Sequence, residues 1–161
     1  MGLLVYVDDI ILAGNNYDEC ATFKRYLHKC FHIKDLGSLK KFLGIEVARS
    51  QIGISLCQRK HALEILAETG LLEIKLVETP MEQGHKLALV KGEETDDASY
   101  RRLVGRLIYL TITRPEISYA VHVLSQFAQA PRKEHFEATM RVVRYIKGSP
   151  SQGILLLAFL F

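Results

Sequence analysis

The chain has 161 residues, of which 48% are hydrophobic, enough for the core of one domain or of two small ones. Its net charge of +3 is only mildly basic, so composition alone does not mark the chain as a polyanion-binding protein. The three cysteines are odd in number and form no Cys-x-x-Cys pair, which argues against a disulfide scaffold and a zinc ribbon.

Two adjacent carboxylates, Asp8 and Asp9, lie between the apolar runs 3–7 and 10–13. Both runs are β-branched-rich and short, so they predict a tight hairpin with the carboxylates at its turn. Because apolar side chains occupy both faces, we expect these strands to be buried in a sheet. Neighbouring carboxylates beside hydrocarbon are costly to ionise without a cation, and all-oxygen ligation suits Mg²⁺. An exposed Asp-Asp turn is the alternative.

The residues after the hairpin predict a helix capped by Asn15-Asn16. Its apolar stripe at helical spacing consists of Cys20, Phe23, Leu27 and Phe31. Gly37 ends this first unit.

A second hairpin is predicted next, from strands over 42–47 and 54–57 that are joined through Gln51-Ile52-Gly53. The spacing of apolar residues over 59–68 then predicts a helix, with Gly70 at its carboxyl end.

The last third of the chain predicts helices. A region from Thr79 to Ala98 with charges, glycine and little periodicity is the expected linker before them. The first helix opens at Asp97 or Ser99, the second has Pro115 at its first position, and the third follows Pro131. The expected fold class is therefore α+β: a small antiparallel sheet with a helix, followed by a helical bundle.

Charge is unevenly distributed along the chain. Residues 99–150 contain nine Lys and Arg against three Glu, a net +6, whereas residues 1–98 contain twelve bases and fifteen acids, a net −3. The basic carboxyl-terminal half suits the binding of a polyanion, and the acidic turn suits the binding of a metal ion. A solvated helix face is the alternative.

The tetrapeptide Tyr6-Val7-Asp8-Asp9 resembles the YxDD box of reverse transcriptases. Further segments follow in the order found in copia-type LTR retrotransposon polymerases, so the resemblance extends to about Ile154. They are Lys34-Asp35-Leu36-Gly37, Phe42-Leu43-Gly44-Ile45-Glu46-Val47, Leu56-Cys57-Gln58-Arg59-Lys60, Tyr100 to Leu107, Thr113 to Ala120 and Arg144-Tyr145-Ile146-Lys147-Gly148.

This resemblance implies a role for each hairpin. Asp8 and Asp9 would be catalytic carboxylates that hold Mg²⁺ or Mn²⁺, with Tyr6 beside the primer terminus. The hairpin over 42–57 is similar to the primer grip, and Leu43-Gly44 would be its contact point because glycine lets a sugar–phosphate approach the backbone. A bulge is the alternative for Gly44.

The helix from Ser99 resembles the thumb helix that follows the minor groove of the template–primer. Arg101, Gly105 and Tyr109 are spaced i, i+4, i+8 and share a face, which would offer a cation, a gap and a flat ring to nucleic acid. On the last helix Arg141 and Arg144 share a face that could also bind nucleic acid, although solvated surface is the alternative.

We expect three regions: residues 1–57 as the carboxyl-terminal part of a palm, 58–150 as a thumb-like helical region with its linker near 79–98, and 151–161 as an apolar tail. That tail departs from the family pattern and is too short to span a membrane, so we expect no membrane partner. With no signal-peptide pattern, the expected location is intracellular, in the cytoplasm, the nucleus or a mitochondrion.

The resemblance also indicates what this sequence lacks. Family polymerases need a third carboxylate well upstream of the YxDD hairpin and fingers that bind the nucleotide, and only seven residues precede Asp8. We therefore expect a fragment, inactive alone, whose partners are an RNA or DNA template–primer and the absent fingers and palm half. A non-catalytic nucleic-acid-binding remnant and a decayed reading frame are the alternatives.

Overall fold

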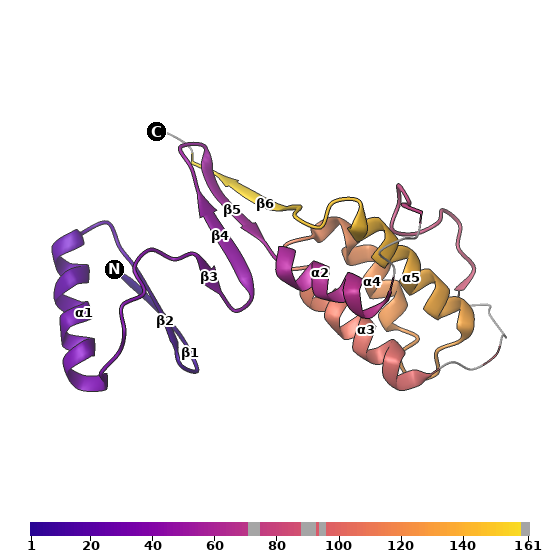
Figure 1. The fold of residues 1–161 in the computed structure, drawn as a ribbon, viewed down its shortest axis with the longest axis horizontal. Coiled ribbons are helices and arrows are strands. Elements are labelled where there is room, and N and C mark those ends of the chain that lie inside the picture. Colours follow the sequence, from indigo (N-terminus) through magenta and orange to yellow (C-terminus); the bar gives the residue numbers. More distant parts are fainter. Residues whose placement is uncertain (71–74, 88–92, 94–95, 159–161) are drawn as a thin grey trace. The chain divides into compact units, whose positions relative to one another are not determined.

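The computed structural model describes residues 1–70, 75–87, 93 and 96–158 (Figure 1). The chain divides into two compact units, Met1–Leu43 and Gly44–Phe161. Strands and helices occur in both units, so the predicted α+β class is confirmed.

The first unit begins with a hairpin of β1 (Gly2–Tyr6) and β2 (Asp9–Ala13). The strands are antiparallel and Tyr6 is the partner of Asp9, which leaves Val7 and Asp8 as a two-residue turn. The predicted hairpin is therefore confirmed, with Asp8 in its turn and Asp9 at the start of β2.

The helix α1 (Tyr17–Phe31) follows β2 and begins where the sequence predicted. The Asn16 side chain accepts hydrogen bonds from the backbone N–H groups of Asp18 and Glu19, at 3.1 and 3.3 Å. Asn16 thus satisfies two donors that the first turn of any helix leaves without partners.

The expectation that the first hairpin is buried was wrong. Every residue of β1 is exposed, and Leu4 keeps 55% of its surface accessible. A two-stranded hairpin has two faces to cover, and among the described residues of this unit only Leu27 is buried. The β1 side chains are therefore surface in this chain, whereas Ile11 and Leu12 of β2 are half-buried.

The second hairpin is confirmed between β4 (Ile45–Arg49) and β5 (Gly53–Cys57), with Glu46 opposite Cys57 and Arg49 opposite Ile54. The single strand predicted over 42–47 was wrong, however. Residues Leu43 and Gly44 form a turn between the short β3 (Lys41–Phe42) and β4, both with positive φ. Leucine is rare in that backbone conformation, so no sequence pattern predicted a turn at this position.

The apolar tail also contains a strand that the sequence analysis missed. Residues Gly153–Leu157 form β6, which pairs antiparallel with β5 and places Gly53 opposite Leu157. An unbroken apolar run has no alternation from which a strand could be recognised. Its partner β5 lies about a hundred residues earlier, which periodicity cannot report.

The helices of the second unit lie close to their predicted positions. They are α2 (Arg59–Glu68), α3 (Asp97–Leu110), the 3-10 helix η3 (Pro115–Ile117), α4 (Ser118–Ser125) and α5 (Lys133–Lys147). The N-cap of α3 is Asp96, whose carboxylate accepts from the Ala98 N–H at 3.0 Å. A hydrogen bond from the Ser99 hydroxyl, together with the bond from the Ala98 N–H, holds the pKa of the Asp96 carboxyl below its usual value.

Four helices, α2, α3, α4 and α5, enclose the core of the second unit. The fully buried side chains at its centre are Ile65, Tyr100, Leu107, Leu110, Ile117, Leu124, Val142, Val143 and Ile146. Tyr100 is held there by a 2.7 Å hydrogen bond from its hydroxyl to the Leu124 carbonyl. Burial raises the pKa of Tyr100 to about 12.

The region predicted as a linker packs on these helices where the structure describes it. Leu87 is buried in the core, and its carbonyl lies 3.1 Å from the His135 ring. Arg141 of α5 donates to the Thr79 carbonyl and to Glu82.

Among the described residues, no helix combines the length and apolar character that crossing a bilayer would require.

Candidate functional site

The turn between β1 and β2 presents the two predicted catalytic carboxylates. Val7, the first turn residue, has a φ of 49°, which a β-branched residue adopts only where the surrounding pairing imposes it. Asp8 and Asp9 are both exposed, and within the described part of the chain neither has an ion-pair partner. Two accessible carboxylates thus stand together at a strained turn.

A complete metal site is not present in the described residues. No group of three or more His, Cys, Asp and Glu side chains comes close enough to hold an ion there. The carboxylate oxygens of Asp8 and Asp9 are the kind of ligand that Mg²⁺ prefers. Two carboxylates, however, fill only part of an octahedral coordination shell.

The Leu43-Gly44 turn, the predicted primer contact, lies against the predicted thumb helix through Gly44. Leu43 and Gly44 have φ values of 47° and 73°, the pair of positive angles typical of a type I′ turn. A Cβ placed on Gly44 would lie 3.0 Å from the hydroxyl oxygen of Tyr109 on α3. The structure therefore brings together Gly44 and Tyr109, two site residues that are 65 positions apart.

His61 of α2 also packs against the Tyr109 ring. The two rings meet edge to face, with centroids 5.1 Å apart and planes at 85°. The Nε2 atom of His61 lies 3.1 Å from the Arg106 carbonyl of α3, so this nitrogen carries the proton and donates. His61 is a site residue that was not predicted from the sequence, because its position in an ordinary helix gives no sign of this contact.

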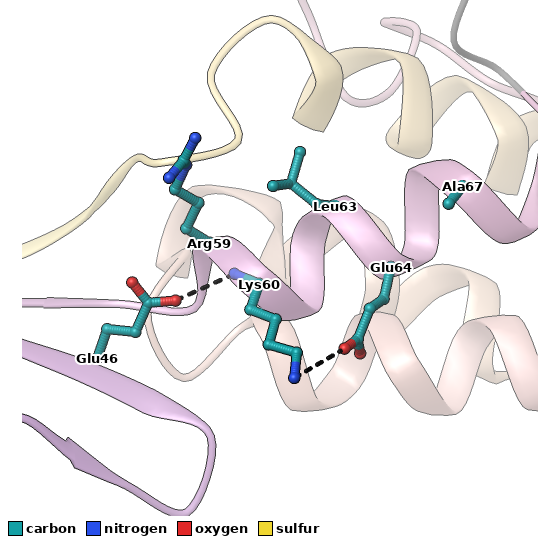
Figure 2. Close-up of a pocket in the computed structure, with 6 residues that line it drawn as sticks. All are labelled: Glu46, Arg59, Lys60, Leu63, Glu64 and Ala67. Atoms are coloured by element: carbon teal, nitrogen blue, oxygen red, sulfur yellow. Dashed lines mark hydrogen bonds and ion pairs between the residues drawn. The ribbon is translucent and has the colours of Figure 1, made fainter.

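Glu46 of β4 ties the same hairpin to the start of α2. Its carboxylate accepts the Lys60 backbone N–H at 3.2 Å, beside a pocket of about 330 Å³ that Arg59, Lys60 and Leu63 help to line (Figure 2). Glu46 thereby satisfies one of the backbone N–H groups that the first turn of α2 leaves without an intrahelical partner.

Two residues of the face of α3 that the sequence predicts for nucleic acid lie at the surface. Arg101 and Gly105 are exposed, and no described atom lies within 4 Å of the position that a Cβ on Gly105 would take. A helix-interior glycine that nothing crowds leaves a notch in the surface of α3, with Arg101 one turn before it.

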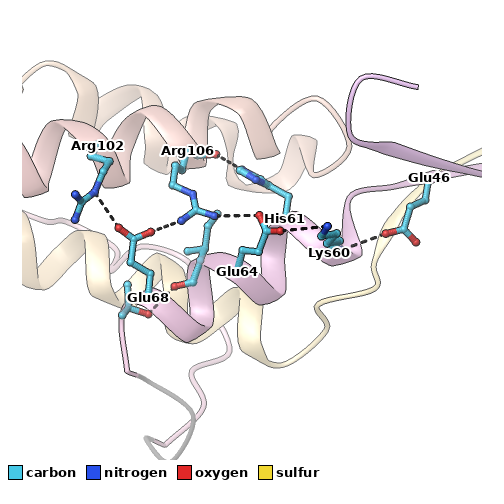
Figure 3. A network of polar contacts seen from close by, with 9 residues as sticks. Glu46, Lys60, His61, Glu64, Glu68, Arg102 and Arg106 are labelled. Atoms are coloured by element: carbon cyan, nitrogen blue, oxygen red, sulfur yellow. Dashed lines mark hydrogen bonds and ion pairs between the residues drawn. The ribbon is translucent and has the colours of Figure 1, made fainter. Parts of the chain in front are cut away.

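Two further arginines of α3 are paired with acids of α2 (Figure 3). Glu68 accepts from Arg102 at 2.9 Å and also from Arg106, whereas Glu64 lies 3.5 Å from Arg106. These pairs neutralise part of the net +6 counted over residues 99–150, so fewer charges remain for a polyanion than the sequence suggested.

The predicted basic face of α5 is engaged within the chain. Arg141 forms an ion pair with Glu82 at 2.8 Å and bonds to Thr79 through its other nitrogens. Arg144 is half-buried, and its Nε atom has no hydrogen-bond partner among the described residues. A nucleic-acid role for these two residues remains a prediction.

Arg114 is a second residue whose importance the sequence analysis missed. Only 1% of it is exposed, and its guanidinium donates to Glu116 and, at 2.8 Å, to the Ser149 carbonyl after α5. The charge also lies 5.8 Å from the centre of the Tyr145 ring. Its place in Thr113-Arg114-Pro115-Glu116, a segment quoted for the family, was the one available signal.

Comparison with known proteins agrees with the order of these segments. Residues 2–83 match the family model described as reverse transcriptase (RNA-dependent DNA polymerase). Retrovirus-related Pol polyproteins from transposons RE1 and RE2 of Arabidopsis thaliana are 45% and 43% identical to the chain over 155 residues. No solved structure matches.

The match covers nearly all of this chain but only part of the length of each relative. The match includes 96% of this chain but 11% of the RE1 and RE2 polyproteins. An uncharacterized mitochondrial protein of Arabidopsis thaliana is 38% identical over 154 residues, which cover 64% of its length. The chain, which spans about a tenth of the polyproteins it matches, thus belongs to the reverse transcriptase family of copia-type transposons.

Proposed function

We propose that this chain supplies the carboxylate turn, the primer contact and the duplex-binding helix of an RNA-directed DNA polymerase. The observation that carries the proposal is the two-residue turn that presents Asp8 and Asp9, inside the segment that matches the family. Accessible carboxylates on a tight hairpin suit the positioning of a metal ion beside a phosphate.

The metal would be Mg²⁺ or Mn²⁺, held in part by Asp8 and Asp9. When bound, such an ion stabilises the charge that develops on phosphate oxygens during nucleotide transfer. The donor chemistry of the two carboxylates fits, but their number supports only weak binding by this chain. Their contribution is to orient four carboxylate oxygens at a turn whose backbone is constrained by strand pairing.

The nucleic acid would be a template–primer duplex that contacts α3. The notch at Gly105 lets a sugar–phosphate come close to the helix, and Arg101 lies one turn away to neutralise a phosphate. Leu43-Gly44 would contact the primer terminus, with Tyr6 beside the carboxylates. Binding of this kind is independent of sequence and sensitive to salt.

Duplex binding tests this proposal. We expect an affinity that falls with salt, with a log–log slope of about −3 to −5, and Arg101→Ala should reduce its magnitude by about one. Gly105→Leu should weaken binding with little change in slope, because it fills the notch without removing charge. A slope near zero for the unchanged chain would contradict the proposal.

Primer extension provides a second test. We expect no extension from annealed template–primer with deoxynucleotides and Mg²⁺ or Mn²⁺, because the described residues contain no group of three or more metal-ligating side chains and two carboxylates alone cannot align the reactants. Extension that Asp8→Asn abolishes would show that self-association or another chain completes the site.

A further inference from the structure

The contact between Gly44 and Tyr109 gives Tyr109 a role other than the direct nucleic-acid contact that its helical spacing suggested. The ring end, rather than only the hydroxyl, lies over the glycine: a Cβ on Gly44 would be 3.7 and 3.8 Å from the Cε1 and Cζ atoms. The hydroxyl end of the ring therefore lies beside Gly44, in space that a side chain at this position would use.

Contacts from α2 hold this ring in place. His61 packs edge-on against it, and the same imidazole donates to the carbonyl of Arg106, three residues before Tyr109 on α3. The ring of Tyr109 thus lies beside Gly44 and also packs against a side chain that is itself bonded to α3.

A second tie acts on the same strand two residues further on. The Glu46 carboxylate accepts from the Lys60 N–H, and Lys60 directly precedes His61. The start of β4 is thus fixed at Gly44 by α3 and at Glu46 by α2, so its direction follows the packing of these two helices.

We propose that Tyr109 and His61 are positioning residues that hold the Leu43-Gly44 turn at a set distance from the duplex-binding face of α3. The inference rests on the proposed function, since it assumes that the turn contacts a primer terminus and that α3 contacts the duplex. As a consequence, the chain would recognise a recessed 3′ end through two surfaces, the Leu43-Gly44 turn and α3. The contact between Tyr109 and His61 would keep these two surfaces at a fixed separation.

The experiment compares two DNA duplexes of equal length and equal overhang, one with a recessed 3′ end and one with a recessed 5′ end. The full chain should bind the recessed 3′ end about threefold or more tightly. Tyr109→Leu and His61→Leu should each bring this ratio close to one while changing the affinity for the recessed 5′ duplex by less than about twofold.

The matched control is Tyr119→Leu on α4, an exposed tyrosine outside this contact, which should keep the preference. Tyr109→Phe, which retains the ring, is the variant to use if Tyr109→Leu fails to fold, and it should lose part of the preference. The Gly44 amide resonance, recorded without nucleic acid, should shift in the Tyr109 and His61 variants and stay unchanged in the control.

Each remaining outcome overturns the inference in a distinguishable way. A preference that survives in folded Tyr109 and His61 variants overturns the inference alone. Loss of preference without a shift of the Gly44 resonance means that Tyr109 contacts the duplex directly, which overturns the positioning role. Equal affinity of the unchanged chain for both duplexes overturns the assignment of the turn, and no binding to either overturns the proposed function as well.

Discussion

The hydroxyl oxygen of Tyr109 lies 3.0 Å from the position that a Cβ on Gly44 would take, closer than an ordinary van der Waals contact. Gly44 also has a φ of 73°, so the residue is constrained both by its own backbone and by a helix 65 positions away. Gly105 on that helix is a contrasting glycine, since no described atom lies within 4 Å of its Cβ position.

Alanine at these two glycines should therefore change stability in opposite directions. Gly44→Ala should lower the free energy of unfolding by about 1–2 kcal/mol, because its positive φ is unfavourable for alanine and the methyl group crowds Tyr109. Gly105→Ala should raise it by about 1 kcal/mol, as expected for an uncrowded helix interior. Urea unfolding of both variants checks this, and equal effects would contradict the contact.

Replacement of the buried Arg114 by lysine should be costly. Lysine cannot reproduce the fork that reaches Glu116 and the Ser149 carbonyl together, so Arg114→Lys should destabilise the fold by about 2–4 kcal/mol. Arg102→Lys is the matched control, because the Arg102 side chain is 65% exposed, and it should change stability by less than about 0.5 kcal/mol. Similar urea midpoints for the two variants would mean that the Arg114 bonds contribute little.

Tyr100 should make the fold sensitive to alkaline pH. Its pKa is about 12 in the folded chain, above the ordinary value of 10.0, because burial disfavours the charged phenolate. The unfolded chain ionises first, so the stabilisation is complete below pH 10 and is lost as pH rises from 10 toward 12. The urea midpoint should fall across this window less steeply in Tyr100→Phe than in the exposed control Tyr119→Phe. Equal slopes in the two variants would contradict this account.

The acids of α2 should limit duplex affinity by pairing with the arginines of α3. Glu68→Gln weakens the hold on Arg102 and Arg106, so it should raise duplex affinity about three- to tenfold at low salt and steepen the salt slope by about one. Glu137→Gln removes the same charge from an exposed position of α5 and serves as the control. An equal gain in duplex affinity in the two variants would mean that the change in net charge, and not the release of the arginines, causes it.

Local signals in the sequence predicted most of the helical structure. Asn16 caps α1 by direct side-chain bonds, and Pro115 occupies the first position of η3. Apolar spacing placed Leu103, Leu107 and Leu110 in the core. These features depend on residues within a turn or two of each other, which is the range that periodicity and capping report.

Features that depend on distant residues could not be predicted in this way. The turn at Leu43-Gly44 places a leucine at positive φ, and β6 exists because β5 offers it an edge. Arg114 is buried because Ser149, 35 positions later, supplies a carbonyl. At the candidate site, the YxDD segment predicted the carboxylate turn, but the packing of Tyr109 on Gly44 required the folded chain.

Paramagnetic broadening by Mn²⁺ tests most directly the central claim that the Asp8-Asp9 turn is a polymerase metal site. Titration of the isotope-labelled chain should broaden the amide resonances of residues 6–11 first, at Mn²⁺ concentrations that reflect weak binding by two carboxylates. The broadening should disappear in the Asp8→Asn, Asp9→Asn double variant and persist when the exposed pair Asp18→Asn, Glu19→Gln is changed instead. Broadening of residues 6–11 that is unchanged in the double variant would contradict the claim.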